Sequence, residues 1–298
     1  MPLTGSLGFG FKVGHYTDAE ALTGCTVVLP PAGNVTSCDI RGSSPGSREL
    51  VLLDLDRRLT ETHGIVLTGG SAFGLASADG VASWLAERGI GYQTPVATVP
   101  IVPAAVVFDL GSGDPMTRPG HAEGRAACDA ATEAAVASGR VGAGSGTTVG
   151  KWAGFEFAAP GGLGFSRAEH GDAAVTALVV VNAVGDIMAA DGSVLRGTSA
   201  PAAEPKELLP DDKDFPTNTV LALVAVEASL TKQEVRWLAG RGSDGITTVV
   251  RPAHTRYDGD VTFAVAAPPR AGSAPANLDI LGPLATQAVA AAIRAAVV

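Results

Sequence analysis

The hydrophobic positions of this chain fall into two kinds of stretch. Short continuous apolar runs predict buried strands, because a strand that is covered on both faces carries few polar residues. Such runs occupy residues 25–29, 64–68, 101–110 and 174–181, begin again at Thr219, and recur at residues 261–266. Between these runs the apolar residues recur at helical spacing, so the pattern predicts strands and helices mixed along one chain.

Helix boundaries are indicated by capping residues and glycines. Thr231 to Glu234 form a capping box, in which the threonine and glutamate satisfy the first backbone N–H groups of a helix. Gly240 and Gly242 are expected to end that helix. The expected helices run from the loop after residue 68 to Arg88, from Gly120 to Ser138, from Thr231 to about Arg241, and from a start between Leu278 and Pro283 to about Ala296.

Two shorter features complete the pattern. Asp191-Gly192 lies between two short apolar stretches and predicts a hairpin turn. Residues 50–59 are compatible with a short helix.

Aromatic residues make up only 5% of the chain, and 38 glycines take much of their place. A core of small residues favours closely stacked sheets and helices, and 298 residues are enough for one large domain or two small ones.

Charge and composition exclude several classes of protein. The formal charge of −9 argues against a nucleic-acid-binding surface. No apolar run reaches membrane-spanning length, and no secretory signal follows Met1, so we expect a cytoplasmic protein without a membrane partner. The three cysteines show no metal-type or redox-type spacing, and the five histidines are scattered. The sequence therefore predicts neither a cofactor nor a metal.

The first candidate for chemistry is Thr219, at the start of a buried strand. Residues 204–216 are charged and contain prolines, so they read as an exposed linker that leads to this strand. If the chain were cut between Asn218 and Thr219, the threonine would own a hydroxyl and a free α-amine. An α-amine titrates near pH ~8 and can take the hydroxyl proton. The alternative is an ordinary strand threonine.

Four further residues are candidates, and each has a simpler explanation. Lys151 follows a long glycine-rich loop and is either a desolvated cation or a surface lysine. Asn182 ends a strand and either donates to an oxyanion or caps a turn. Asp258 and Asp260 flank a glycine and either face one cationic group or form a turn before a strand. The glycine-rich turn at residues 69–75 lacks the spacing of a nucleotide-binding loop and is explained by close packing of a strand and a helix.

Taken together, ordered motifs along nearly the whole chain resemble those of the autoprocessing L-aminopeptidase/D-esterase family, which also contains β-aminopeptidases and nylon-oligomer hydrolases. The subgroup that hydrolyses oligomers of 6-aminohexanoate is the most similar, because it combines a threonine nucleophile with a lysine and an Asp-Gly-Asp. The motifs are Val13 to Tyr16, Thr23 to Thr26, Asp39 to Gly42, Thr68 to Leu75, Val149 to Lys151, Val180 to Gly185, Asn218-Thr219, and His254-Thr255 with Asp258 to Asp260.

The resemblance implies an α/β fold of four layers, the αββα sandwich of N-terminal-nucleophile hydrolases. It implies one domain over residues 1–298 that cleaves itself into segments 1–218 and 219–298, which stay associated. It also implies a homo-oligomer, a tetramer. Carried over by position, Thr219 is the nucleophile, Lys151 and Asn182 lie beside it, and Asp258 and Asp260 complete the site.

Three positions depart from the family pattern. Members often have glycine before the asparagine and a second threonine after the nucleophile, where this chain has Thr217 and Val220. Thr217 is stiffer than glycine, which bears on the rate of self-cleavage. Some members carry a tyrosine where this chain has Phe108.

The sequence leaves three functions open. The first is an amide hydrolase that acts on short linear amides, such as 6-aminohexanoate oligomers or β-peptides, or as an aminopeptidase/D-esterase on natural peptides. The second is an acyltransferase like the ornithine acetyltransferases, although Asn218 stands where those usually have alanine. The third is an uncut relative that only binds a small molecule or a partner.

Overall fold

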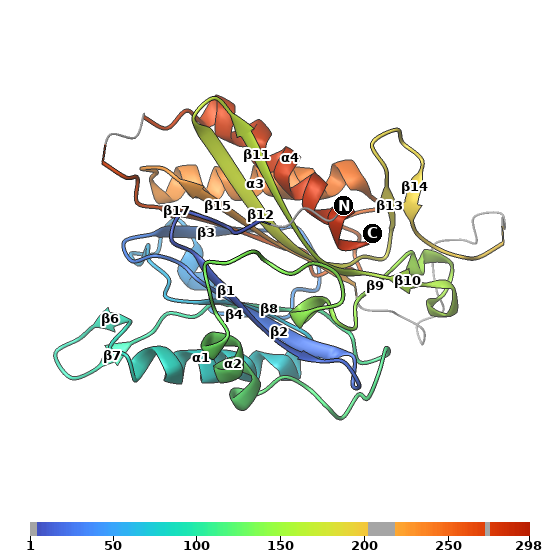
Figure 1. Cartoon of the computed structure of the whole chain (residues 1–298), viewed down its shortest axis with the longest axis horizontal. Helices are drawn as coiled ribbons and strands as arrows, with labels where there is room; N and C mark the ends of the chain where they lie inside the picture. Colours follow the sequence, from blue (N-terminus) through green and yellow to red (C-terminus); the bar gives the residue numbers. More distant parts are fainter. Residues whose placement is uncertain (1–4, 202–217, 272–274) are drawn as a thin grey trace.

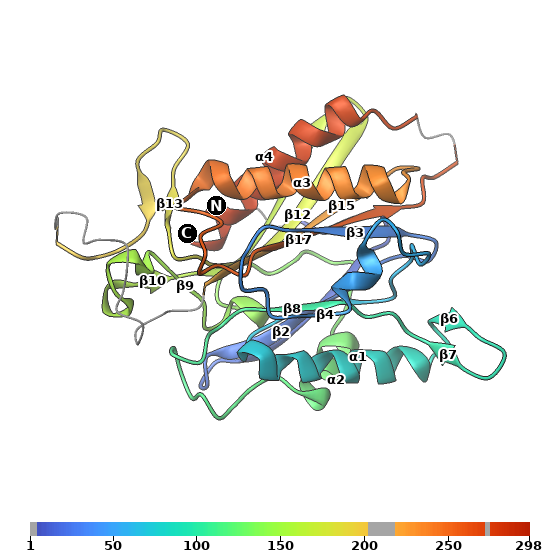
Figure 2. The same cartoon turned by 180° about the vertical axis from the view of Figure 1, so that it is seen from behind.

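The computed structural model describes residues 5–201, 218–271 and 275–298. Within them, two five-stranded sheets are stacked face to face, and a pair of helices covers the outer face of each sheet (Figures 1 and 2). The α/β fold of four αββα layers that the sequence predicts is therefore confirmed. Thr217 and the expected linker at residues 204–216 lie outside the described residues.

The first sheet has the order β1-β2-β5-β8-β4. Its central pair, β5 and β8, is parallel, and the other neighbours are antiparallel. Helices α1 and α2 pack on its outer face and against each other. The elements of this half are β1 Lys12–Asp18, β2 Thr23–Leu29, β4 Ser47–Arg48, β5 Ile65–Thr68, β8 Ala104–Val106, α1 Ser77–Ala86 and α2 His121–Asp129.

The second sheet has the order β11-β12-β15-β17-β3 and holds the site. The pair β15 and β17 is parallel, whereas the remaining pairs are antiparallel. Helices α3 and α4 cover the outer face of this sheet (Figure 2). The elements of this half are β3 Val35–Ile40, β11 Gly162–His170, β12 Ala173–Asn182, β15 Thr219–Glu227, β17 Val261–Ala267, α3 Lys232–Val249 and α4 Leu278–Ala296.

Short elements lie outside the two five-stranded sheets. The Asp191-Gly192 hairpin is confirmed, with Ile187 of β13 opposite Arg196 of β14. Residues 50–59 contain one short 3-10 helix. The remaining elements are β6 Tyr92–Gln93, β7 Thr98–Val99, β9 Thr148–Val149, β10 Ala159–Pro160, β13 Asp186–Met188, β14 Val194–Arg196, β16 Val250–Arg251 and the 3-10 helices η1 Leu50–Leu53, η2 Ser71–Ala76, η3 Gly142–Gly144, η4 Lys151–Ala153 and η5 Phe155–Phe157.

Side-chain alternation along β15 divides its residues between two cores. Val220, Ala222 and Val224 pack against α3 and α4, whereas Leu221 and Leu223 pack into the space between the sheets. Because successive strand residues point to opposite faces, Thr219 belongs to the inter-sheet side. The site therefore begins where the inter-sheet core ends.

Three expected elements have wrong boundaries. Helix α2 ends at Asp129 instead of Ser138, because residue 132 instead forms a β-bridge with Val13. Strand β8 covers only Ala104–Val106 of the expected residues 101–110. The expected bounds of the last helix are confirmed, since α4 runs from Leu278, after its cap Asn277, to Ala296, with Pro283 inside the helix.

Helix α3 continues through Gly240 and Gly242 to Val249, past its expected end near Arg241. The capping box at Thr231 is confirmed. Gly242 is needed for packing rather than for ending the helix: a Cβ there would lie 2.8 Å from side-chain carbons of both Val224 and Thr262. The glycine thus lets α3 approach the sheet that carries the site.

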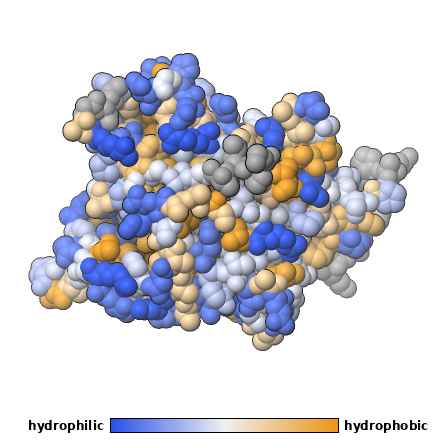
Figure 3. Space-filling view, viewed as in Figure 1, coloured by the Kyte–Doolittle hydropathy of each residue, from blue (hydrophilic) through white to orange (hydrophobic). Residues whose placement is uncertain are grey.

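The surface of the face in Figure 3 is mostly hydrophilic, with separate hydrophobic patches. No helix in the described residues combines the length and apolar character needed to span a bilayer. Cys25, Cys38 and Cys128 all lie in the described ranges as buried free thiols.

We predict that Gly242→Ala destabilises the protein although alanine favours helices. The added methyl overpacks the contact between α3 and the sheet, and such overpacking costs about 1–3 kcal/mol. Gly240→Ala is the matched control, because its nearest neighbour would be the Arg41 guanidinium at 3.8 Å. That control should be neutral or stabilised by up to about 1 kcal/mol. Denaturant unfolding measures both, and equal effects of the two substitutions would contradict the packing argument.

Candidate active site

Thr219 is the first residue of β15, with a neighbouring strand on each side. Towards β12 it is paired with Asn182, the last residue of that antiparallel strand. Towards β17 the preceding residue, Asn218, forms a parallel bridge with Asp258. Because β15 and β17 run parallel, their starts lie at the same edge of the sheet. Segments that are distant in sequence therefore meet around residue 219.

The carbonyl oxygen of Asn218 accepts two hydrogen bonds. The hydroxyl Oγ1 of Thr219 donates to it at 2.5 Å, and the backbone N–H of Gly259 donates to it at 2.8 Å. Thr219 is 6% exposed, and Asn218 is buried. A hydroxyl and a fixed N–H on one carbonyl are the parts needed for attack on that carbonyl and for stabilising the resulting oxyanion.

Gly259 must be glycine for this arrangement. A Cβ at this position would lie 2.7 Å from the carbonyl oxygen of Ser44 and 3.0 Å from Oγ1 of Thr219. The loop that contains Ser44 is held close to Gly259, because the backbone N–H of Ser44 donates to the carbonyl of Asp258 at 3.1 Å. The lack of space for a side chain thus requires glycine between the two aspartates, and the hydrogen bond to Asn218 holds this residue in place.

Lys151 is buried next to Asn182. Its ammonium nitrogen donates to the backbone carbonyl and to the side-chain oxygen of Asn182, both at 3.0 Å. The same side-chain oxygen accepts the N–H of Thr148 at 3.0 Å, while the amide nitrogen of Asn182 donates to the carbonyl of Phe108 at 3.1 Å. The lysine is 3% exposed. Of the two alternatives that the sequence left open, a desolvated cation and a surface lysine, the structure therefore supports the first.

Burial lowers the pKa of Lys151 from 10.5 to about 7, because a charged ammonium loses its hydration. The negative charge of Asp258 opposes this change. A lysine with a pKa near neutrality is populated in both protonation states at pH 7, which is the range in which a side chain can exchange protons with a reacting group.

Asp258 and Asp260 face different partners. One oxygen of Asp258 accepts the N–H of Thr255 at 2.7 Å and the Thr255 hydroxyl at 2.6 Å. Burial, followed by the charge of Asp260, raises the pKa of Asp258 from 3.8 to about 6, while Thr255 and Lys151 act in the opposite direction. The Asp258 carboxyl therefore also titrates close to neutral pH.

Asp260 connects the strand start to a histidine. One of its oxygens accepts the backbone N–H of Val220 at 2.6 Å, and the other lies 2.6 Å from Nδ1 of His254. The loop residues Arg41 and Gly42 donate their N–H groups to the Asp260 carbonyl. This carboxylate therefore orients the residue that follows Thr219.

The structure brings together all the residues that the sequence proposed: Asn218 and Thr219 with Lys151, Asn182, Asp258 and Asp260. Sequence reasoning missed the roles of the Gly259 N–H and the Phe108 carbonyl, since backbone groups carry no residue-specific signal. It also gave no role to His254 and Thr255, although both belong to the motif that contains the aspartates.

Comparison with known proteins adds an independent finding. The family model described as peptidase family S58 matches residues 9–298. The chain belongs to this family.

Relatives of this S58 peptidase carry two kinds of name. An uncharacterised aminopeptidase of Mycobacterium tuberculosis is 39% identical, over 95% of this chain and 88% of the relative. A 6-aminohexanoate-oligomer endohydrolase of Kocuria sp. is 31% identical, over 86% of this chain and 72% of the relative. Both names describe hydrolysis of an amide bond, so the S58 peptidase belongs among amide hydrolases.

Solved structures confirm the fold. A Burkholderia sp. β-aminopeptidase superposes with a TM-score of 0.73 at 21% identity, covering 99% of this chain and 88% of the other. The L-aminopeptidase D-Ala-esterase/amidase from Ochrobactrum anthropi, described as a variant of the Ntn hydrolase fold, gives 0.72 at 19% identity, with 99% and 87% covered. The S58 peptidase therefore has an Ntn-hydrolase fold.

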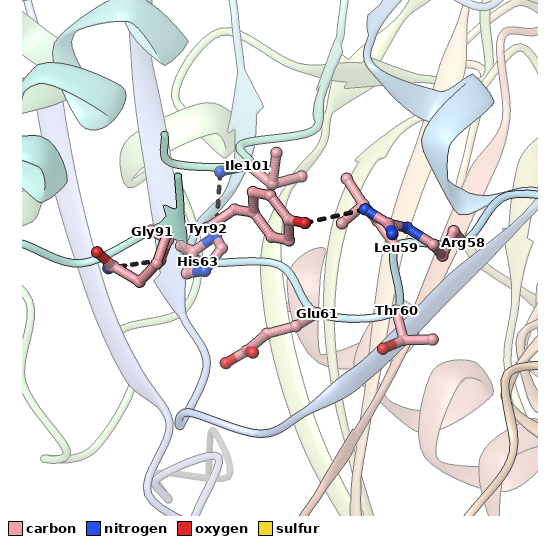
Figure 4. A pocket seen from close by; sticks show the side chains of 9 residues that line it. Arg58, Leu59, Thr60, Glu61, His63, Gly91, Tyr92 and Ile101 are labelled. Carbon is pink, nitrogen blue, oxygen red and sulfur yellow. Dashed lines mark hydrogen bonds between the residues drawn. The ribbon is translucent and has the colours of Figure 1, made fainter. Parts of the chain in front are cut away.

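A separate hollow of about 420 Å³ lies on another part of the surface (Figure 4). Arg58, Glu61, His63, Tyr92 and Ile101 are among its lining residues, and Arg58 donates to the Tyr92 hydroxyl across it at 2.9 Å. It shares no residue with the site at Thr219.

Among the described residues, no group of three or more His, Cys, Asp or Glu side chains is arranged to hold a metal.

We predict that Lys151 makes stability increase between pH 7 and about 10. Because its folded pKa is about 7 and its ordinary value is 10.5, the unfolded chain binds the extra proton in this range, so the folded state gains stability as pH rises. Lys151→Met should remove this gain. Denaturant unfolding across the pH range, in a Thr219→Ala background that keeps the chain uncut, measures the difference.

The control is Lys12→Met, since Lys12 is exposed. It should leave the pH dependence unchanged. The same slope in the Lys151→Met and parent proteins would show that Lys151 is not desolvated as the structure indicates.

Proposed function

We propose that this S58 peptidase is an autoprocessing amide hydrolase whose nucleophile is Thr219. One observation supports this most directly: the Thr219 hydroxyl and the Gly259 N–H both donate to the Asn218 carbonyl oxygen, at 2.5 and 2.8 Å. An attacking group and an oxyanion donor thus already sit on the bond that would be cut.

In the first reaction, Oγ1 of Thr219 forms a bond to the Asn218 carbonyl carbon, and the C–N bond to Thr219 breaks. The hydroxyl proton passes to the departing nitrogen, with Lys151 as the group that can accept and return it because its pKa is about 7. This shift frees the Thr219 α-amine, and water then cleaves the ester, which releases the Asn218 carboxylate and restores the Thr219 hydroxyl. The products, segments 1–218 and 219–298, stay associated.

In the second reaction, the freed Thr219 attacks the amide of a substrate. Its α-amine takes the hydroxyl proton and gives it to the leaving amine, and water then cleaves the acyl ester on Oγ1, which releases the acid and restores the hydroxyl. The buried Asp258 and Asp260 supply negative charge at the start of the two parallel strands, where that amine would lie. Asn182 and the Gly259 N–H are the donors for the substrate oxyanion, a contribution typically worth about 3 kcal/mol.

The substrates are short linear amides. The names of the relatives point to peptides with a free N-terminus and to oligomers of 6-aminohexanoate. Both are linear chains of secondary amides that end in a free amine, so one site could accept either. Assembly as a homo-tetramer, which the family resemblance implies, stays a prediction.

Self-cleavage is tested by denaturing mass spectrometry of the purified chain over time. The parent protein should yield segments 1–218 and 219–298, while Thr219→Ala should remain one chain because it lacks the attacking oxygen. Thr219→Ser should still be cut, since it keeps a hydroxyl at this position. A parent chain that stays intact, or a Thr219→Ala protein that is cut and active, would contradict the proposal.

Substrate choice is tested with a panel of equal-length amides built from α-, β- and ω-amino acids. Hydrolysis should require prior cleavage at residue 219 and should be absent in Thr219→Ala. A free amine is added as a competing acceptor, because capture of the acyl group by that amine instead of water would indicate an acyltransferase. No turnover of any member by the cut protein would exclude short linear amides as substrates.

A further inference from the structure

His254 lies between two hydrogen-bond acceptors. Its Nδ1 is 2.6 Å from Oδ2 of Asp260, and its Nε2 is 3.3 Å from the backbone carbonyl of Ser243 in α3. A carbonyl can only accept, and an ionised carboxylate likewise. A neutral imidazole has one N–H and can satisfy one of these partners, whereas an imidazolium donates to both. The geometry therefore fits the charged ring.

The surroundings hold this ring in place. The side chain is 12% exposed, and the residue has a φ of 52°, in the left-handed region that few non-glycine residues adopt. Such a conformation persists where neighbouring contacts favour it. The contacts of both ring nitrogens provide that support.

The charges around His254 favour its protonated form. Burial by itself would lower the pKa of His254, but the hydrogen bond and charge of Asp260, with the Ser243 carbonyl, outweigh burial and raise it above 6.5. Arg41 acts against the cation, although its own guanidinium is paired with Asp39 at 2.8 Å and Asp244 at 3.0 Å.

Asp260 connects His254 to the residue that follows Thr219. Asp260 binds the ring with one oxygen and the N–H of Val220 with the other, at 2.6 Å each. Val220 follows Thr219 directly, so the position of this carboxylate determines where the strand start lies. Losing the hydrogen bond on Oδ2 would let the carboxylate rotate away from the Val220 N–H.

We propose that His254 is a positioning residue: as an imidazolium that bridges Asp260 and the Ser243 carbonyl, it holds Asp260 on the Val220 N–H and so keeps Thr219 aligned with the Asn218 carbonyl. This inference rests on the proposed self-cleavage. Because the pKa of His254 is raised, the imidazolium is fully present at low pH and is lost as the pH rises through that value.

The first test measures self-cleavage of the full chain by denaturing mass spectrometry from pH 5.5 to 9. His254→Gln should cut about ten- to hundredfold more slowly at pH 6, as expected for loss of a charge-assisted hydrogen bond. The ratio of parent to variant rates should shrink as the pH rises, because the parent then loses its imidazolium. A purely structural role would lower the rate by the same factor at every pH.

Two further variants make this test decisive. His121→Gln is the control, since His121 is exposed and contacts only the Ser83 hydroxyl among the hydrogen bonds of the described residues; it should cut at the parent rate. His254→Asn covers the case in which His254→Gln does not fold, because asparagine tolerates a left-handed backbone. Parent-like cleavage in a folded His254 variant would overturn the proposal.

The second test reads the ring directly and needs no activity. NMR of ¹⁵N-histidine-labelled Thr219→Ala protein, with the His254 signals identified by their loss in the double variant with His254→Gln, should show both ring nitrogens protonated at pH 6.5. A single protonated nitrogen there would overturn the proposal. A parent chain that never cuts would instead refute the proposed function, and the NMR result would still decide the charge on His254.

Discussion

The parallel pairing of β15 with β17 is the constraint on which the site depends. Parallel neighbours start at the same edge of a sheet, and the crossover through α3 returns the chain to that edge, so the residues before each strand are brought together. Here that pairing sets the Gly259 N–H on the Asn218 carbonyl and Asp260 on the Val220 N–H. The antiparallel strand β12 then adds Asn182 from the other side.

Electrostatics in this small space are shaped by burial. Burial lowers the pKa of Lys151 to about 7 and raises the pKa of Asp258 to about 6, whereas Asp260 raises the pKa of His254 against the effect of burial. The raised pKa of Asp258 and the lowered pKa of Lys151 share one main cause, the loss of hydration. A site of this kind can exchange protons with a reacting group at neutral pH.

Much of this arrangement could be predicted from the sequence, and the failures have physical reasons. The long apolar strands and the capping box at Thr231 are local signals that can be read from the sequence. The fold and the candidate side chains were predicted from the ordered motifs, including the one at Thr219. The end of α3 was misjudged because Gly242 serves a packing contact that only the neighbouring sheet reveals. The Gly259 N–H and the link from His254 to α3 depend on distant segments meeting, which no local pattern records.

The order β11-β12-β15-β17-β3 has a consequence for how the protein could be assembled. A nick before Thr219 would leave β15 and β17 of the second piece between β12 and β3 of the first, so the cores on both faces of this sheet would be shared by the two pieces. Residues 219–298 would therefore depend on the first segment for the strands on both sides of β15 and β17. Such an enzyme would fold as a single polypeptide and would become two associated segments only after the sheet had formed.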